Sequence, residues 1–338
     1  MKIGTIGRGA IVDRFIKAIS MTDHVELVAV YSRKLDDAKA YAAQHQVDAY
    51  YDSIDAMLAD ETVDTVYVAS PNSLHYEQSL QALHAKKNVI CEKPFTSTLA
   101  ETEHLIAVAK ANNVFLFEAI TTIHLPNYEV VRNQLPNLGN MKMATLNFSQ
   151  YSSRYDKYKD QIVTNAFDPN FSGGALMDIN IYNIHFVMGL FGKPESYTYY
   201  PNIGFNGIDT SGTLIMRYDT FTVNCIGCKD CSSDYFTLLQ GDNGSVKVSG
   251  GSTGVCPIVE KVPLKGDQID VANAQDNPNC IGVNQHFHMA YEVDNFQKII
   301  EANDFEACYK LLDHTRDVMD VVYHARLAAG ITFPVDKD

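Results

Sequence analysis

The sequence predicts two domains: a doubly wound α/β domain with a parallel sheet, then an α+β domain on an open, mostly antiparallel sheet. Three observations lead to this prediction. At 338 residues the chain exceeds what one ordinary hydrophobic core covers. In its first third, short and nearly continuous apolar segments alternate with helical patterns, which is typical of repeated βα units. After about Pro126, segments of alternating apolar and polar residues indicate antiparallel strands with one covered face.

Five short apolar segments predict the parallel strands of the first domain. The segment VDTVYVAS is apolar nearly throughout, as expected for a strand covered by helices on both faces. The predicted strands are Lys2–Gly7, Val25–Ser32, Val63–Ser70, Asn88–Cys91 and Val114–Ala119. The predicted helices between them are Ala10–Ser20, Leu35–Gln46, Asp52–Ala59, Leu74–Lys86 and Leu99–Asn112.

No low-complexity linker separates the two parts, so we expect a tight crossover near residues 119–126, with domains 1–122 and 123–338. The predicted strands of the second domain are Lys142–Gln150, Thr213–Tyr218, Phe221–Ile226, Tyr235–Gln240 and Ser245–Val248. Helices are expected on one face of this sheet. They are the strongly apolar Gly174–Phe191 and the amphipathic Ala290–Glu301 and Phe305–Ala328.

A glycine turn follows the first strand and opens the first helix. In Gly7-Arg8-Gly9, continued by Ala10 and Ile11, the first glycine permits the tight turn. The second lets the backbone approach a pyrophosphate at the positive helix N-terminus. This is the Rossmann dinucleotide-binding fingerprint, although its third glycine position is filled by Val12. The alternative is a βα turn that binds nothing.

The end of the second strand indicates which cofactor is preferred. NAD enzymes place a carboxylate there to bind the ribose hydroxyls, but this chain has Ser32 and Arg33. A hydroxyl followed by a guanidinium can hold the extra phosphate of NADP through charge-assisted hydrogen bonds. We therefore predict NADP(H) over NAD(H). The phase of the following helix places Asp36 and Asp37 away from the strand end. The alternative interpretation, that Arg33 is a solvated residue at the helix start, stays open.

Another strand of the first domain ends in Cys91-Glu92-Lys93-Pro94. Ligands of this fold bind beyond the carboxyl ends of the strands, where Lys93 lies. Glu92 beside it predicts an ordered charge pair. A strand-end surface lysine is the alternative interpretation.

Three polar residues lie on the apolar helix of the second domain. Asp178, Tyr182 and His185 follow i, i+4, i+7 spacing, which puts them on one stripe. Burying polar groups without partners costs a few kcal/mol each, about 1–3 in protein mutational data. They therefore form a structural network or face a polar cleft.

Together these residues resemble the Gfo/Idh/MocA oxidoreductases, and the matches run through most of the chain. The matching residues are Gly7-Arg8-Gly9-Ala10-Ile11 with Phe15, Ser70-Pro71-Asn72 with His75, Glu92-Lys93-Pro94, Glu118-Ala119 with Pro126, Gly173-Gly174-Ala175-Leu176-Met177-Asp178 and Gly241-Asp242-Asn243-Gly244-Ser245.

The resemblance implies an oxidoreductase that transfers a hydride between NADP and a sugar, polyol or vicinal diol. It implies that Tyr182 is the acid/base, assisted by Lys93, and that Asp178 orients a second substrate hydroxyl. It also implies that Pro71 and Asn72 lie against the nicotinamide ribose. The remaining residues on the cofactor side are then Ser70, His75 and Glu92. Tyr182, four residues after Asp178, is similar to the branch of the family that contains dimeric dihydrodiol dehydrogenase, D-xylose dehydrogenase and glucose–fructose oxidoreductase. Members of that branch mostly use NADP.

Two departures from that branch leave the substrate open. Thr122-Ile123 stands where many relatives have Trp-Arg, and His185 stands where Asn is frequent. His185 contacts substrate or is a buried histidine satisfied by backbone. The competing functions are a non-catalytic NAD(P)-binding regulator of the same fold and a transhydrogenating enzyme that keeps its cofactor bound. The resemblance also implies a homodimer or a dimer of dimers through the second sheet.

Charge and cysteine usage exclude several classes of partner. The net charge is -14 and no basic run forms a patch, which argues against nucleic acid and anionic membrane. Seven irregularly spaced cysteines and no apolar signal core predict a reduced, cytoplasmic protein. No metal is expected. On a strand, Cys225 and Cys231 would point one way and Cys228 the other. His286, His288 and Glu292 are interpreted as surface residues.

Overall fold

The computed structural model describes residues 1–265, 269–273 and 287–337. It divides into two compact units. Unit 1 consists of Met1–Ala119 and Met289–Met319, and unit 2 consists of Ile120–His288 and Asp320–Asp338.

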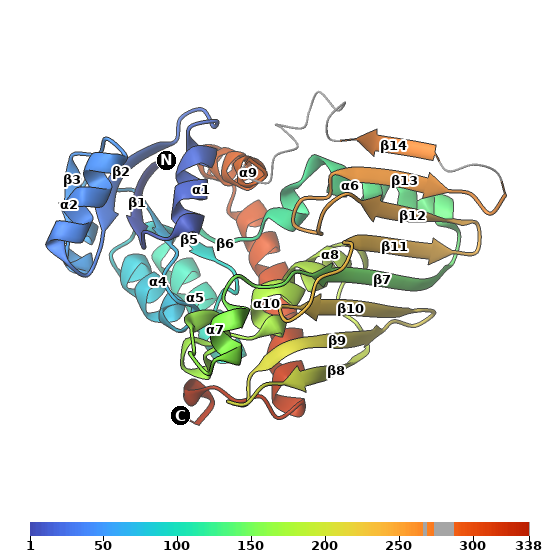
Figure 1. The fold of residues 1–338 in the computed structure, drawn as a ribbon. Helices are drawn as coiled ribbons and strands as arrows, with labels where there is room; N and C mark the ends of the chain where they lie inside the picture. Colours follow the sequence, from blue (N-terminus) through green and yellow to red (C-terminus); the bar gives the residue numbers. More distant parts are fainter. Residues whose placement is uncertain (266–268, 274–286, 338) are drawn as a thin grey trace. The chain divides into compact units, whose positions relative to one another are not determined.

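Unit 1 is built on a six-stranded parallel sheet of order β3-β2-β1-β4-β5-β6, which confirms the predicted doubly wound domain (Figure 1). Its strands are β1 (Lys2–Ile6), β2 (Glu26–Tyr31), β3 (Ala49–Tyr51), β4 (Thr65–Val68), β5 (Asn88–Glu92) and β6 (Leu116–Ala119). Its helices are α1 (Ala10–Ile19), α2 (Leu35–Gln44), α3 (Ile54–Leu58), α4 (His75–His84), α5 (Leu99–Asn112), α9 (Met289–Glu301) and the first part of α10 (Phe305–Ala328).

The segment 289–319 belongs to unit 1, although the sequence analysis placed it in the second domain. Aromatic contacts hold it there: the ring of Phe296 stacks on Phe117 at 4.4 Å between centroids, and Phe305 stacks on Phe115 at 4.2 Å. An apolar helix stripe indicates that a helix is covered but does not say which sheet covers it. The position of α9 and α10 in the sequence was therefore a poor guide.

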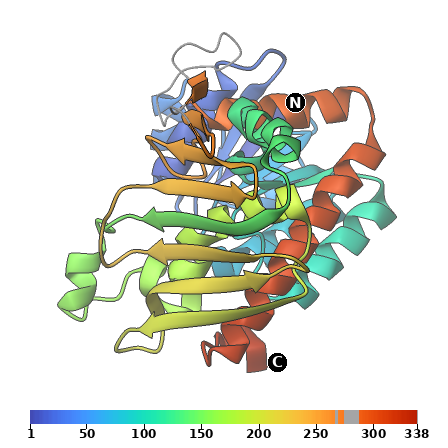
Figure 2. The same ribbon diagram turned by 90° about the vertical axis from the view of Figure 1, so that its right-hand side faces the viewer.

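Unit 2 is built on an eight-stranded sheet of order β14-β13-β12-β11-β7-β10-β9-β8, and Figure 2 looks onto one of its faces. Only the β7–β10 pair is parallel among the strand pairs of the described residues, so the prediction of a mostly antiparallel sheet is confirmed. Its strands are β7 (Met141–Ser149), β8 (Ser196–Ile203), β9 (Asp209–Arg217), β10 (Thr222–Cys228), β11 (Phe236–Gly241), β12 (Gly244–Ser249), β13 (Ile258–Val262) and β14 (Ile269–Asn273).

The helices of unit 2 are α6 (Pro126–Gln134), α7 (Tyr155–Lys159), α8 (Ile181–Phe191) and the end of α10. Helix α8 lies against β10, where Asn180 and Asn183 donate side-chain hydrogen bonds of 2.9 Å to the carbonyls of Cys225 and Ile226. The segments β3, β8, β13, β14, α6 and α7 were not among the predicted elements. In the part of the chain described, every helix is too short or too polar to span a bilayer.

Candidate functional site

The glycine turn of unit 1 has the geometry expected of a pyrophosphate cradle. Gly7 has φ +116°, and a Cβ built on it would lie 2.6 Å from the carbonyl oxygen of Ala69, so only glycine fits. Gly9 caps the N-terminus of α1 without a side-chain hydrogen bond, and a Cβ built there would meet nothing within 4 Å. The first turn of α1, which carries the amides of Ala10 and Ile11, thus follows a residue whose side-chain position is open. These features fit a phosphorylated cofactor.

We expect Gly9→Ala to weaken NADPH binding by about tenfold or more while leaving stability within about 0.5 kcal/mol of wild type. The added methyl group enters the space that a pyrophosphate needs, and φ -81° at Gly9 suits alanine. Titration of NADPH and thermal unfolding measure the two effects. Gly7→Ala is the contrasting variant, with an expected loss of about 1–3 kcal/mol of stability. Unchanged affinity in Gly9→Ala would favour a turn that binds nothing.

The end of β2 carries the residues predicted to select the cofactor. The backbone amide of Ser32 donates to the carbonyl of Tyr51 at 3.1 Å, which fixes the strand end, and Arg33 is exposed beyond it. Arg8 of the glycine turn is paired with Asp37 at 2.7 Å, so this carboxylate is turned toward the neighbouring loop. Ser32, Arg33 and Arg8 thus lie on the loops that follow β1 and β2, which are adjacent strands.

His75 joins the loops that follow β4 and β5. Its ring nitrogens lie 2.9 Å from the carbonyl oxygens of Ser70 and Pro94, and its side chain is buried. His75 has a pKa lowered by burial, although its two carbonyl contacts oppose this shift. It therefore fixes the position of the Lys93-Pro94 segment, with Lys93 itself half-buried. Pro71 and Asn72, at the start of the short helix Asn72–Leu74, are also half-buried.

Three carboxyl groups are buried in unit 1. Glu92 at the end of β5 accepts a 2.6 Å hydrogen bond from the Tyr67 hydroxyl, and Glu118 of β6 accepts one of 2.9 Å from Thr315. Glu292 of α9 is fully buried, and among the described residues neither of its carboxylate oxygens has a hydrogen-bond partner. The interpretation of Glu292 as a surface residue was therefore wrong, and His286 lies outside the described residues.

Burial shifts the pKa of two of these groups, Glu292 and Glu92. It raises the pKa of Glu292 well above its ordinary value, and the carboxylates of Glu92 and Glu118 raise it further. Burial also raises the pKa of Glu92 to about 7, although the Tyr67 hydrogen bond and the Lys93 ammonium oppose the shift. At neutral pH Glu92 is therefore close to the midpoint of its titration, and the Lys93 ammonium favours its ionised form.

Because these acids have raised pKa values in the folded state, the folded chain binds protons that the unfolded chain has released. Stability therefore falls as pH rises from about 4.5, the ordinary value for glutamate, through about 7 for Glu92. We expect Glu292→Gln to remove up to about 1.4 kcal/mol per pH unit of that slope. Denaturant unfolding between pH 5 and 8 measures it, with the exposed Glu306→Gln as control. An unchanged slope would mean that Glu292 is ionised in the folded protein.

In unit 2 the helix that carries the predicted substrate residues begins at a crowded glycine. Gly174 has φ +107°, and a Cβ there would lie 2.1 Å from a carboxylate oxygen of Asp209. The same buried Asp209 accepts hydrogen bonds of 2.7 Å from the Leu176 amide and the Tyr199 hydroxyl. Gly174 therefore leaves room for the buried carboxylate of Asp209, which anchors the start of the helix.

The first turn of this helix is a π-helix, Leu176–Asn180, before α8 begins at Ile181. Such turns are rare in proteins as a whole, but those that occur are often found at functional sites. The wider turn interrupts the α-helical stripe predicted for Asp178, Tyr182 and His185. Asp178 and Tyr182 are half-buried, whereas His185 is fully buried.

Asp178 forms an ion pair with Lys229, which the sequence analysis did not single out. The Lys229 side chain is only 6% exposed, and its ammonium lies 5.3 Å from the ring centroid of Phe167. Lys229 follows the last residue of β10. In the sequence, Lys229 is notable only for its position at a strand end between two cysteines. That position does not indicate an ion pair with Asp178, about 50 residues earlier in the chain.

The remaining two helix residues have different surroundings. The Tyr182 ring lies 5.6 Å from that of Phe148, and a Cβ on Gly254 would approach Tyr182 to 3.0 Å. His185 lies near His124, whose pKa is lowered to about 3 by burial and by His185. Full burial favours His185 as an interior histidine over a substrate ligand.

Comparison with known proteins gives the family. Residues 1–120 match the family model GFO_IDH_MocA, described as "Oxidoreductase family, NAD-binding Rossmann fold". The chain is 34% identical over 342 residues to the uncharacterized oxidoreductase YgjR of Escherichia coli (strain K12) and 33% over 340 residues to scyllo-inositol 2-dehydrogenase (NADP(+)) IolU of Bacillus subtilis (strain 168). Both alignments cover 100% of this chain and 99% of the relative. Human trans-1,2-dihydrobenzene-1,2-diol dehydrogenase is 26% identical over 347 residues, with the same coverage.

Solved structures share the fold. An NAD binding oxidoreductase from Klebsiella pneumoniae superposes with a TM-score of 0.85 at 17% identity, covering 100% of this chain and 98% of that one. The 3-ketoreductase KijD10 from Actinomadura kijaniata, in complex with NADP and TDP-benzene, gives 0.81 at 20% identity, covering 96% and 97%. This shared fold carries the glycine turn, the Glu92-Lys93-Pro94 segment and the anchored helix start. YgjR and IolU, which match over the whole chain, both exceed 30% identity. The chain therefore belongs to the Gfo/Idh/MocA family of oxidoreductases.

Proposed function

We propose that the chain is an NADP(H)-dependent dehydrogenase or reductase that transfers a hydride between the nicotinamide and a carbon of a sugar, polyol or vicinal diol. The observation that carries the proposal is the half-buried Lys93, placed by His75 at the carboxyl end of β5, where this fold binds ligands. The 33% identical relative over the whole chain, named an NADP-dependent scyllo-inositol 2-dehydrogenase, supports the substrate class.

In the proposed reaction, Tyr182 takes the hydroxyl proton of an alcohol, or gives a proton to a carbonyl in reduction. Lys93 polarises the same substrate oxygen and favours the ionised form of the phenol. Asp178, held by Lys229, orients a second substrate hydroxyl. When bound, the nicotinamide supplies or accepts the hydride. Pro71 and Asn72 would hold the ribose of the nicotinamide and so help to orient it toward the substrate.

The preference for NADP(H) is proposed from Ser32 and the exposed Arg33 at the end of β2. We expect Arg33→Ala to raise the Kd for NADPH by about 10- to 100-fold, because a charge-assisted contact to the extra phosphate is lost. The Kd for NADH should not change. Parallel fluorescence titrations measure both values, and Lys34→Ala, at the next residue and also exposed, is the matched control. Tighter binding of NADH than of NADPH by the wild type would contradict the proposal.

The alternative function is a non-catalytic NAD(P)-binding regulator of the same fold. Turnover separates the two. NADPH and NADH absorbance is followed while the protein meets aldoses, polyols and vicinal diols in both directions. Turnover with NADP(H) supports the enzyme, and tight NADPH binding without turnover across the panel supports the regulator. We further place the protein in the cytoplasm as a homodimer or a dimer of dimers, and light scattering tests the assembly.

A further inference from the structure

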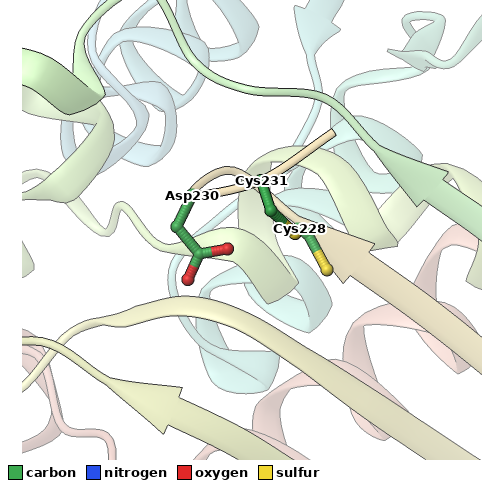
Figure 3. A group of neighbouring side chains, drawn as sticks. All are labelled: Cys228, Asp230 and Cys231. Carbon is green, nitrogen blue, oxygen red and sulfur yellow. The ribbon is translucent and has the colours of Figure 1, made fainter. Parts of the chain in front are cut away.

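Two cysteines and an aspartate converge at the end of β10. Cys228 is the last residue of the strand, and Asp230 and Cys231 follow it in the loop (Figure 3). Their sulfur and carboxylate ligand atoms all lie within 4.8 Å of one another. No residue of this group takes part in the proposed hydride transfer.

The sequence analysis discounted a metal site because, on a continuous strand, Cys228 would point to the opposite face from Cys225 and Cys231. That argument fails here, since β10 ends at Cys228 and the chain then turns. Cys225 stays in the strand and is fully buried, whereas Cys231 is exposed. The turn therefore brings the Cys231 sulfur toward Cys228 and leaves Cys225 out of the group.

The loop is held in place by its neighbours. The Lys229 amide donates to the carbonyl of Thr210 at 2.9 Å, and the carbonyls of Cys228 and Lys229 accept from Gln150 and Ser152 at 2.9 Å each. One carboxylate oxygen of Asp230 accepts from the hydroxyls of Thr210 at 2.7 Å and Ser211 at 2.8 Å. Such outer hydrogen bonds orient a ligating carboxylate. The backbone of the loop and the Asp230 carboxylate are thus held in place by β9 and by the segment that follows β7.

We propose that Cys228, Asp230 and Cys231 bind a thiophilic divalent cation of the Zn²⁺ type. Two thiolates and one carboxylate are a donor set that Zn²⁺ accepts. Three protein ligands leave a fourth position, which the exposure of Cys231 opens to water.

The cation would also act on the predicted substrate end. Lys229 lies between the two cysteines and pairs with Asp178 on the helix start. Metal binding would clamp the short loop that carries this lysine. The metal site itself does not depend on the proposed hydride transfer, so its test needs no substrate.

Titration with Co²⁺ as a spectroscopic probe tests the site in the full, freshly reduced chain under anaerobic conditions. We expect one equivalent to bind with a sulfur-to-cobalt charge-transfer band, and Zn²⁺ to displace it. Cys228→Ser and Cys231→Ser should each weaken the band and the binding of Co²⁺, because one of two thiolates is lost, and Asp230→Asn should weaken Co²⁺ binding by about tenfold or more. Cys225→Ala, which removes a thiol from the same strand, should retain the band. Zn²⁺ should raise the melting temperature of the wild type but not of the two serine variants.

Three results would overturn the proposal. The first is the absence of a thiolate band in the wild type, and the second is a band of unchanged intensity in both serine variants. The third is a Cys228–Cys231 disulfide, seen as a loss of two hydrogen masses in an air-exposed chain, together with no metal binding after reduction.

Discussion

Tyr182→Phe is expected to lower kcat for the proposed hydride transfer by about 10²- to 10⁴-fold, the range for loss of a positioned general acid/base. The substitution removes only the hydroxyl. The ring still packs against Phe148 and next to Gly254, so the fold and the NADPH affinity should be unchanged. Steady-state kinetics with the substrate found in the panel measures the loss, and thermal unfolding checks the fold.

Tyr235→Phe is the matched control, because Tyr235 also contacts Phe148, with its ring centroid at 5.4 Å. It should keep full turnover. If Tyr182→Phe also keeps full turnover, the assignment of Tyr182 as the acid/base is wrong, although the protein is still an enzyme.

Lys93→Met should lower kcat by about 10²- to 10³-fold, since it removes the charge that stabilises a developing oxyanion. If Lys93 and Tyr182 act on one oxygen, their effects are not additive. The double variant should then fall little below the weaker of the two single variants. The product of the two losses, found instead, would mean that the residues act in separate steps.

Lys93→Met also changes its surroundings, because the Lys93 ammonium lowers the pKa of the buried Glu92. Stability is therefore measured at the assay pH, where loss of the ammonium should favour protonated Glu92. Lys39→Met, at an exposed position of α2, is the control for a general effect of charge.

The strands and helices of the first domain could be predicted because their sequence patterns are local. Apolar runs such as those of β1 and β4 are long enough to stand out, whereas β3 has only three residues, Ala49–Tyr51. The attachment of α9 to unit 1 depends on contacts such as Phe296 with Phe117, across about 180 residues of chain. No pattern within the helix encodes that partner.

The residues of the glycine turn and of the Lys93 segment were also accessible, because chemistry and position coincide at strand ends. Lys229 and the π-helical turn were not. Lys229 became notable only through its ion pair with Asp178, and a π-turn has no reliable local signature. Glu292 was misjudged because a glutamate is seldom fully buried without a partner.

Transfer of deuterium from NADPH that carries deuterium at both hydrogen positions of nicotinamide C4 tests the central claim most directly. The wild-type chain is incubated with labelled NADPH and the carbonyl forms of the sugar, polyol and diol panel, and products are analysed by mass spectrometry. The proposed function predicts one deuterium on the newly formed carbinol carbon of at least one product, with loss of the label in Tyr182→Phe. Saturable NADPH binding with no deuterium in any panel product would contradict it and favour a regulator.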